Sequence, residues 1–308
     1  MCMHTTVRIA TFGFLSIGAA LGQSESIDYR ITTQSELVLL DVGVKNAKGE
    51  NVLRLTKDNF RIYENGKLQI ISDFSNEDLP ATTGLILDSS GSMIAKRADV
   101  LNGGLVFIHA SNPTDEMFIA DFNDRVNFRL PPGIPFSRDQ LLLRDALLSV
   151  HDQGRTALYD AVYESLLHLK SSKQERKALI LISDGGDNCS RHNLRDVIAA
   201  ARESLATIYS IGMFDADDPD RNPGLLKNLA HITGGQTFFP GQISEVIDIC
   251  REIARDIRSR YTIGYRPVRR NDQAELRSLT VKLVDTEKAT VRARTVYQLP
   301  ARLSGEPR

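Results

Sequence analysis

The sequence lacks an excess of charge of either sign, and it has few cysteines. Its 308 residues include 38 basic and 39 acidic side chains, which alternate along the chain and form no blocks. This balance excludes the basic face of a nucleic-acid-binding protein, so we expect no nucleic-acid partner. Of the three cysteines, Cys2 lies near the N-terminus, and spacing alone leaves open whether Cys189 and Cys250 form a disulfide.

Long apolar segments are also absent, except near the N-terminus. The run Ile9–Leu21 follows Arg8, is rich in Gly and Ala, and is short for a membrane span. Small residues then precede a cleavage point that we place between Gly22 and Gln23. We therefore predict a signal peptide at residues 1–22 and a mature chain without a transmembrane span, exported to the periplasm or secreted. The alternatives are a short buried helix and an uncleaved anchor.

Strand patterns predict a small β module before the centre of the chain. Its predicted strands are Glu36–Val44, Phe60–Tyr63 and Leu68–Phe74. The second and third strands flank Asn65-Gly66, and Asn-Gly between two such runs is a strong hairpin signal because both residues accept positive φ. We assign residues 23–79 to this N-terminal β module.

Strand patterns return after the centre. They predict strands at Tyr261–Tyr265, Ser278–Val284 and Thr290–Tyr297. Because the two ends of a domain often lie close together, we expect these strands, within residues 259–300, to join the N-terminal β module. Residues 301–308 are predicted to be a disordered tail.

Strands and helices alternate between residues 80 and 258, which predicts one α/β domain. The predicted strands are Gly84–Leu87, Met117–Phe122, Val126–Leu130, Ala178–Ile182, Thr207–Met213 and Gln236–Phe239. The predicted helices are Ala95–Ala110, Arg138–Val150, Thr156–Lys170, Leu194–Ser204, Pro223–Ile232 and Ser244–Arg260. The unbroken apolar run Ala178–Ile182 is typical of a parallel strand buried on both faces. The expected fold is a Rossmann-like, doubly wound, mostly parallel α/β sheet flanked by the β module.

Three polar clusters fall where predicted strands end or a helix begins. They are Asp88-Ser89-Ser90-Gly91-Ser92, Gly154-Arg155-Thr156 and Ser183-Asp184-Gly185-Gly186-Asp187-Asn188. In open parallel sheets, ligands bind beyond the carboxyl ends of the strands. Carboxylate and hydroxyl oxygens suit a small hard cation such as Mg²⁺, and no His or Cys accompanies the clusters as a ligand set for zinc or copper. Each cluster alone is also compatible with a helix cap or a turn.

Together, these motifs resemble a known family. Asp-x-Ser-x-Ser after a buried strand, a later Gly-x-Thr-x-Leu, and Asp-Gly after another buried strand look like the metal-ion-dependent adhesion site of von Willebrand factor type A domains. They stand here as DSSGS at Asp88–Ser92, GRTAL at Gly154–Leu158 and SDGGDN at Ser183–Asn188. The resemblance covers roughly Ala81–Arg258. The flanking LTKDNFRIYENGK and YTIGYRP also resemble the acidobacterial VWFA-related family of exported bacterial proteins.

The resemblance implies a metal site that binds another protein. Ser90 and Ser92 would bind a divalent cation through their hydroxyls, and Thr156 would bind it directly or through water. Asp88 and Asp184 would lie close, often through waters, and would orient the other ligands. One coordination position would stay open for an Asp or Glu carboxylate of a partner protein. Mg²⁺ is the expected cation, with Mn²⁺ or Ca²⁺ as alternatives.

Two further features carry weaker predictions. The acidic loop Asp215–Gly224 resembles a calcium loop, but it lacks the full EF-hand spacing and its terminal Glu, so a solvated loop is favoured over a second metal site. The histidines are scattered without the pattern of a catalytic triad, and no serine lies in a Gly-x-Ser-x-Gly motif. We therefore assign no catalytic residue.

These observations predict an exported, non-enzymatic binding protein that serves adhesion or assembly. One alternative is a metal-dependent phosphoryl-transfer enzyme with Asp88 as the nucleophile. Such an enzyme would want a second acid two residues later, where this chain has Ser90, and no well-placed Lys or His supplies acid–base chemistry. The other alternative is an envelope scaffold subunit with a vestigial metal site.

Overall fold

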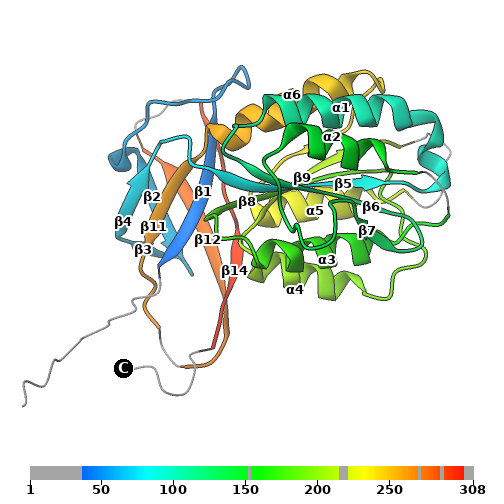
Figure 1. Cartoon of the computed structure of the whole chain (residues 1–308). Coiled ribbons are helices and arrows are strands. Elements are labelled where there is room, and N and C mark those ends of the chain that lie inside the picture. The colour runs from blue at the N-terminus through cyan, green and yellow to red at the C-terminus, as the bar shows by residue number, and fades with distance from the viewer. Residues whose placement is uncertain (1–36, 152–153, 215–220, 270–271, 285–287, 302–308) are drawn as a thin grey trace, which may run out of the picture. The chain divides into compact units, whose positions relative to one another are not determined.

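The computed structural model describes residues 37–151, 154–214, 221–269, 272–284 and 288–301, and Figure 1 shows how their strands and helices are arranged. All of these residues belong to one unit of the chain, Ser35–Arg308. The predicted signal peptide, most of the predicted tail and the acidic residues 215–220 lie outside the described residues.

A six-stranded sheet forms the centre of the α/β domain, in the order β10-β9-β8-β5-β6-β7. Its strands are β5 (Ala81–Asp88), β6 (Glu116–Phe122), β7 (Val126–Phe128), β8 (Arg176–Ser183), β9 (Thr207–Gly212) and β10 (Thr237–Phe238). All neighbours are parallel except β6 and β7, which are antiparallel. Every residue of β5 is buried, as expected for a central parallel strand with helices on both faces. The predicted fold class is confirmed.

Helices cover both faces of this sheet. Figure 1 shows α1 (Arg97–Ala110), α2 (Gln140–Leu148) and α6 (Glu245–Arg258) on one face. The other face carries α3 (Leu158–Lys170), α4 (Leu194–Glu203) and α5 (Pro223–Thr233). Successive side chains of β5 point to opposite faces, so Leu85 and Leu87 pack in the core under α1 and α6, whereas Ile86 packs in the core under α3. The predicted helix at Ala95–Ala110 differs at its start, because residues Gly91–Lys96 form a 3₁₀ helix.

Two antiparallel sheets build the β module from both ends of the chain. One has the order β13-β1-β11-β4 and the other β14-β12-β2-β3. The strands of the first sheet are β1 (Val38–Lys45), β4 (Ile71–Ser75), β11 (Tyr261–Tyr265) and β13 (Thr290–Arg292). The strands of the second are β2 (Phe60–Glu64), β3 (Lys67–Gln69), β12 (Glu275–Leu283) and β14 (Val296–Leu299). Strand β1 pairs with β11, and β2 pairs with β12, so N-terminal and C-terminal segments share each sheet.

Two of the predicted strands are wrong as single elements, because each one is divided between the two sheets. In the predicted strand Leu68–Phe74, β3 pairs with β2 and β4 pairs with β11. In the predicted strand Thr290–Tyr297, β13 pairs with β1 and β14 pairs with β12. Where two sheets share one core, strands that bend from one sheet to the other form its corners. The hairpin prediction holds, since β2 and β3 are joined at Asn65 and Gly66, which have φ of 48° and 78°.

Buried arginines join the β module to the α/β domain. The Arg176 guanidinium, at the start of β8, donates to the Ile257 carbonyl at 3.2 Å and to the Arg260 carbonyl at 3.0 Å. The Arg294 guanidinium, between β13 and β14, donates to the carbonyls of Ala201 and Ala206, both at 2.8 Å. These contacts give hydrogen-bond partners to both the buried guanidinium groups and the backbone carbonyls.

Replacing Gly235 with alanine is expected to destabilise the fold by about 2 kcal/mol or more, because overpacking a rigid contact forces the backbone to shift. Gly235 lies between α5 and β10, and a Cβ there would come within 1.9 Å of the Ile208 carbonyl oxygen. Chemical unfolding measures the change. Gly241→Ala is the matched control, since its Cβ would meet nothing closer than 3.9 Å. Equal stability of the two variants would contradict the packing described here.

Candidate metal centre

Three loops meet at the carboxyl ends of β5 and β8, and they line one polar hollow of about 270 Å³. The first loop is Asp88–Ser92, the second is Gly154–Thr156 and the third is Ser183–Asn188. Its lining residues are Ser90, Gly91, Ser92, Gly154, Arg155, Thr156, Asp184, Gly186 and Asn188. Four of the five residues predicted to serve the metal therefore line the polar hollow. The fifth, Asp88, is hydrogen-bonded to the backbone of Ser90. The structure thus brings the predicted set together from segments far apart in sequence.

Asp88 orients the first loop through hydrogen bonds to both of its carboxylate oxygens. Its Oδ1 accepts the Ser90 backbone N–H at 3.0 Å, and its Oδ2 accepts the Ser183 hydroxyl at 2.7 Å. Asp88 is buried, so both oxygens are engaged within the protein. Ser90 is the N-cap of the 3₁₀ helix Gly91–Lys96, but its hydroxyl makes no capping hydrogen bond.

The hydroxyls of Ser90 and Ser92 lie next to one another at the polar hollow. The Oγ atoms of Ser90 and Ser92 lie 3.1 Å apart, and the Ser92 hydroxyl donates to Asp184 Oδ2. Ser92 is exposed, whereas Asp184 is buried. The Thr156 side chain also lines the polar hollow, and its hydroxyl has no hydrogen-bond partner among the described residues.

The second and third loops are tied by backbone hydrogen bonds. The Thr156 N–H donates to Asn188 Oδ1, and the Asn188 N–H donates back to the Thr156 carbonyl, both at 3.0 Å. The Gly91 N–H donates to the Gly154 carbonyl at 3.2 Å, which links the first loop to the second. Helix α3 begins at Leu158 with Ala157 as its N-cap, so Thr156 does not cap it. These contacts fix the position of Thr156 while its hydroxyl remains available.

The electrostatics of the site favour a bound cation. Burial, together with the nearby charge of Asp184, raises the pKa of Asp88 to about 6, against the opposing effect of hydrogen bonds from Ser90 and Ser183. Two carboxylates held close in a buried place repel one another, and a divalent cation would relieve that repulsion.

The donor set fits a hard cation. It consists of carboxylate and hydroxyl oxygens, which are ligands that Mg²⁺ and Ca²⁺ prefer. No group of three His, Cys, Asp or Glu side chains among the described residues could form a metal site of its own. A cation held at the polar hollow would meet the neutral hydroxyls of Ser90, Ser92 and Thr156, which line it.

The comparison with protein families agrees with this geometry. The family model for the von Willebrand factor type A domain matches residues 83–186, which include all five residues predicted to serve the metal. The chain carries a von Willebrand factor type A domain. A search of curated proteins finds no match to the sequence.

Solved structures show the same fold. A von Willebrand factor type A protein from Catenulispora acidiphila has 13% identity and a TM-score of 0.53, over 87% of this chain and 75% of that one. Proximal thread matrix protein 1 from the mussel byssus, solved with a zinc-occupied MIDAS motif, has 16% identity and a TM-score of 0.51. That match covers 64% of this chain and 50% of the mussel chain.

A buried network supports the first loop of the von Willebrand factor type A domain, and sequence reasoning missed it. The Ser89 hydroxyl lies 2.9 Å from Asp121 Oδ2 and 3.0 Å from the Phe122 carbonyl oxygen. Asp121, on β6, also accepts two hydrogen bonds from the Arg129 guanidinium. The hydroxyl to which the sequence assigned no metal role therefore anchors the loop. Ser183 and Asn188 were also missed as supports, although they stand within the motifs.

Replacing Ser89 with alanine should lower stability by about 1.5–3 kcal/mol, the contribution of a hydrogen bond to a charged group, because it removes the bond to the buried Asp121 carboxylate. The variant should still bind one cation per chain, because Ser89 is turned away from the polar hollow towards β6. Urea unfolding and an Mn²⁺ titration measure the two effects. Ser72→Ala, at an exposed serine on β4, is the control. Loss of cation binding without loss of stability would show instead that Ser89 is a ligand.

The cysteines of the domain are not paired. Cys189 and Cys250 are both free, so the disulfide left open by the sequence does not form. Cys250 lies buried on α6, and this burial raises the pKa of its thiol to about 12. The Cys189 thiol lies on the third loop, 3.7 Å from the Asn123 carbonyl oxygen.

Proposed function

We propose that the protein is an exported, non-enzymatic binding protein that holds a divalent cation in the polar hollow. The cation takes an Asp or Glu carboxylate of a partner protein at its open position. The observation that carries this proposal is the convergence of three hydroxyls and two carboxylates at one edge of the sheet, from three loops spread between residues 88 and 184.

Each residue of the site has a distinct task in this proposal. Ser90, Ser92 and Thr156 hold the cation through their hydroxyls, while Asp88 and Asp184 orient them and balance its charge. Because the direct ligands are mostly neutral, the cation keeps a strong attraction for an incoming carboxylate. Mg²⁺ is the proposed cation, and the mussel protein with zinc in its MIDAS motif shows that this fold can hold a divalent ion.

The geometry weighs against the phosphoryl-transfer alternative. A nucleophilic carboxylate needs an oxygen free to attack, yet both oxygens of Asp88 accept hydrogen bonds and the side chain is buried. Ser90 occupies the place where such an enzyme would carry its second acid. We therefore propose a binding function and no catalytic residue.

Export is part of the same proposal and rests on the sequence of residues 1–22, which lie outside the described residues. No helix in the part of the chain that the structure describes is long and apolar enough to cross a membrane. We propose a periplasmic or secreted protein, and detection of the mature N-terminus at Gln23 by mass spectrometry would test it.

Affinity capture with and without a chelator tests the binding function. The purified full-length protein, immobilised in Mg²⁺, should retain a partner from an envelope or culture fraction, release it in EDTA, and retain it again when Mg²⁺ is restored. Capture that is unchanged in EDTA would contradict the metal bridge. If the protein binds no cation at millimolar concentrations, the scaffold alternative with a vestigial site is favoured.

A further inference from the structure

Arg155 stands beside the proposed cation site and has no role in it. It lies between Gly154 and Thr156 and is the one basic side chain among the described residues that line the polar hollow. Its side chain is 68% exposed, so a ligand in the polar hollow can reach it. A cationic side chain next to an open metal position is a second place where an acidic ligand can bind.

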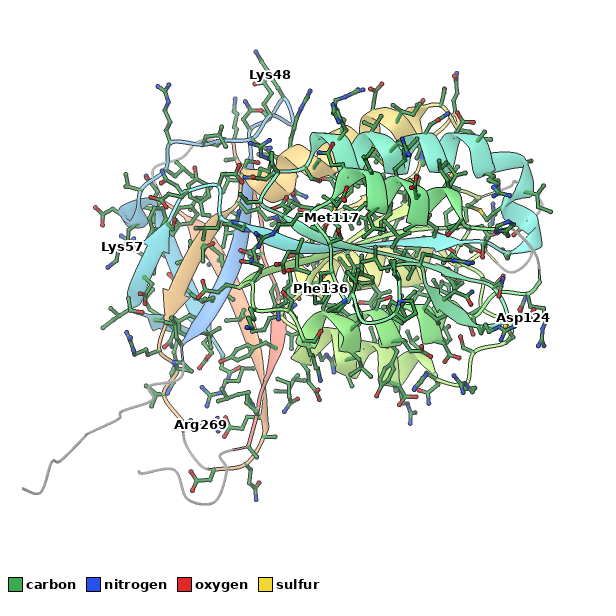
Figure 2. All side chains as sticks on the ribbon, in the orientation of Figure 1. Lys48, Lys57, Met117, Asp124, Phe136 and Arg269 are labelled. Atoms are coloured by element: carbon green, nitrogen blue, oxygen red, sulfur yellow. The ribbon has the colours of Figure 1, made fainter. Side chains whose placement is uncertain are left out.

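The guanidinium is held in place by Asp124, on the loop between β6 and β7. The Arg155 Nε donates to Asp124 Oδ1 at 2.8 Å. Figure 2 shows Asp124 at the right-hand edge of the view. If Gly154 carried a Cβ, that atom would lie 2.3 Å from Asp124 Oδ2. The Asp124 carboxylate therefore packs directly against the backbone of the second loop. The hydrogen bond lowers the pKa of Asp124 and raises that of Arg155, so both groups stay charged.

This pairing leaves part of the guanidinium available. Only Nε donates a hydrogen bond to Asp124, and the two terminal amino groups of Arg155 have no hydrogen-bond partner among the described residues. Those groups form the fork that binds a carboxylate through two parallel hydrogen bonds. Asp124 therefore orients the side chain without filling its binding edge.

The charged groups at the polar hollow indicate which kind of ligand would bind there. A divalent cation would offset the charges of Asp88 and Asp184, whereas Asp124 uses only the Nε hydrogen of Arg155. A partner with a single carboxylate would use the cation and leave the terminal edge of Arg155 in water. A partner with two acidic groups would satisfy both positions.

We propose that Arg155 is a specificity residue, and that the site selects a partner segment with two neighbouring acidic side chains. One carboxylate meets the cation and the other meets the terminal amino groups of Arg155. This inference rests on the proposed function and names the partner chemistry of the same site. Arg155 acts on the ligand and is not required to hold the cation.

The competing view is that the Arg155–Asp124 pair only braces two loops. A brace would affect the stability of the site and therefore every ligand equally. A specificity residue affects only a ligand that carries a second carboxylate. Comparison of dicarboxylates with a monocarboxylate therefore separates the two roles.

The test uses full-length protein loaded with Mn²⁺, with ligand binding followed by the water-proton relaxation rate. The probes are butyrate as the monocarboxylate, and succinate, glutarate and adipate as dicarboxylates of increasing length. The variants are Arg155→Gln, which removes the charge, and Arg155→Lys, which keeps it without the fork. Arg125→Gln is the matched control, since Arg125 is exposed beside Asp124 but does not line the polar hollow.

At least one dicarboxylate should bind the wild type about fivefold more tightly than butyrate, the size of an exposed ion pair. Arg155→Gln should remove this preference, Arg155→Lys should restore part of it, and Arg125→Gln should keep it in full. The affinities for Mn²⁺ and butyrate should not change.

The experiment distinguishes failure of the inference on Arg155 from failure of the proposed function. If the wild type binds Mn²⁺ and butyrate but shows no preference for any dicarboxylate, or if Arg155→Gln keeps the preference, the inference on Arg155 is overturned and the proposed function stands. If the wild type binds no Mn²⁺, or binds Mn²⁺ without any carboxylate, the proposed function is overturned and the inference falls with it.

Discussion

Replacing Ser90 and Ser92 together with alanine should weaken Mg²⁺ binding by at least about 100-fold while the protein stays folded. Loss of even a supporting residue of a metal site costs roughly 10- to 100-fold in affinity, and this change removes two of the three proposed hydroxyl ligands. The stability cost should be small, about 1 kcal/mol, because the two hydroxyls bond chiefly to one another and to Asp184. Isothermal titration calorimetry and urea unfolding measure the two quantities.

The matched control for this double variant is Ser171→Ala with Ser278→Ala. Both serines are exposed and lie away from the polar hollow. The control should bind Mg²⁺ like the wild type. If the Ser90 and Ser92 double variant also binds like the wild type, the hydroxyls are not ligands and the assignment of the site is wrong.

Replacing Asp256 with asparagine is expected to produce the largest loss of stability, about 3–5 kcal/mol, because it leaves buried arginine charge without its partner. Asp256 lies on α6 and is buried between Arg260 and Arg292 of the β13 strand. Its Oδ2 also accepts the Tyr209 hydroxyl at 2.5 Å. This cluster connects the last helix of the domain to the central sheet and the β module, so its loss should weaken all three.

Chemical unfolding measures this change, with Asp248→Asn as the control. Asp248 lies on the same helix, its side chain is 81% exposed, and it pairs with Arg251 on the surface. An exposed pair contributes roughly 0–1 kcal/mol. Similar losses in the two variants would contradict the role given to the buried cluster.

The pH dependence of the Asp256 effect follows from its pKa. Burial alone would raise the pKa of Asp256, but the charges of Arg260 and Arg292 and the hydrogen bond from Tyr209 outweigh it and hold the pKa below the ordinary value of 3.8. A lowered pKa stabilises the fold above the unfolded value and loses that contribution as the pH falls through the folded value. The stability difference between wild type and Asp256→Asn should therefore be constant near neutral pH and shrink below pH 3.8.

Most of the central sheet could be predicted from the sequence because its signals are local. An unbroken apolar run such as that of β8 indicates a buried strand, and helical spacing of apolar residues such as that of α6 indicates a helix. Neither signal requires knowledge of the neighbouring elements. The gathering of the candidate site residues could be predicted for a related reason. Because the carboxyl ends of parallel strands meet at one edge, polar residues after β5 and β8 were expected to lie together, as they do.

The remaining features depend on contacts between distant segments. No local pattern shows that β13 and β14 join different sheets. Between them, Arg294 makes hydrogen bonds to the carbonyls of Ala201 and Ala206, which lie about ninety residues earlier in the chain. The support of Ser89 by Asp121 likewise joins residues 32 positions apart. The pairing of Arg155 with Asp124 could be found only once the two loops had been placed side by side.

A titration of the metal-free, full-length protein with Mg²⁺, Mn²⁺ and Ca²⁺ tests the central claim most directly. We expect saturable binding of one cation per chain, with Mg²⁺ binding weakened by at least about 100-fold in the Ser90 and Ser92 double variant. Absence of saturable binding for all three cations at millimolar concentrations, or equal binding by the double variant, would contradict the claim that the polar hollow is a metal site.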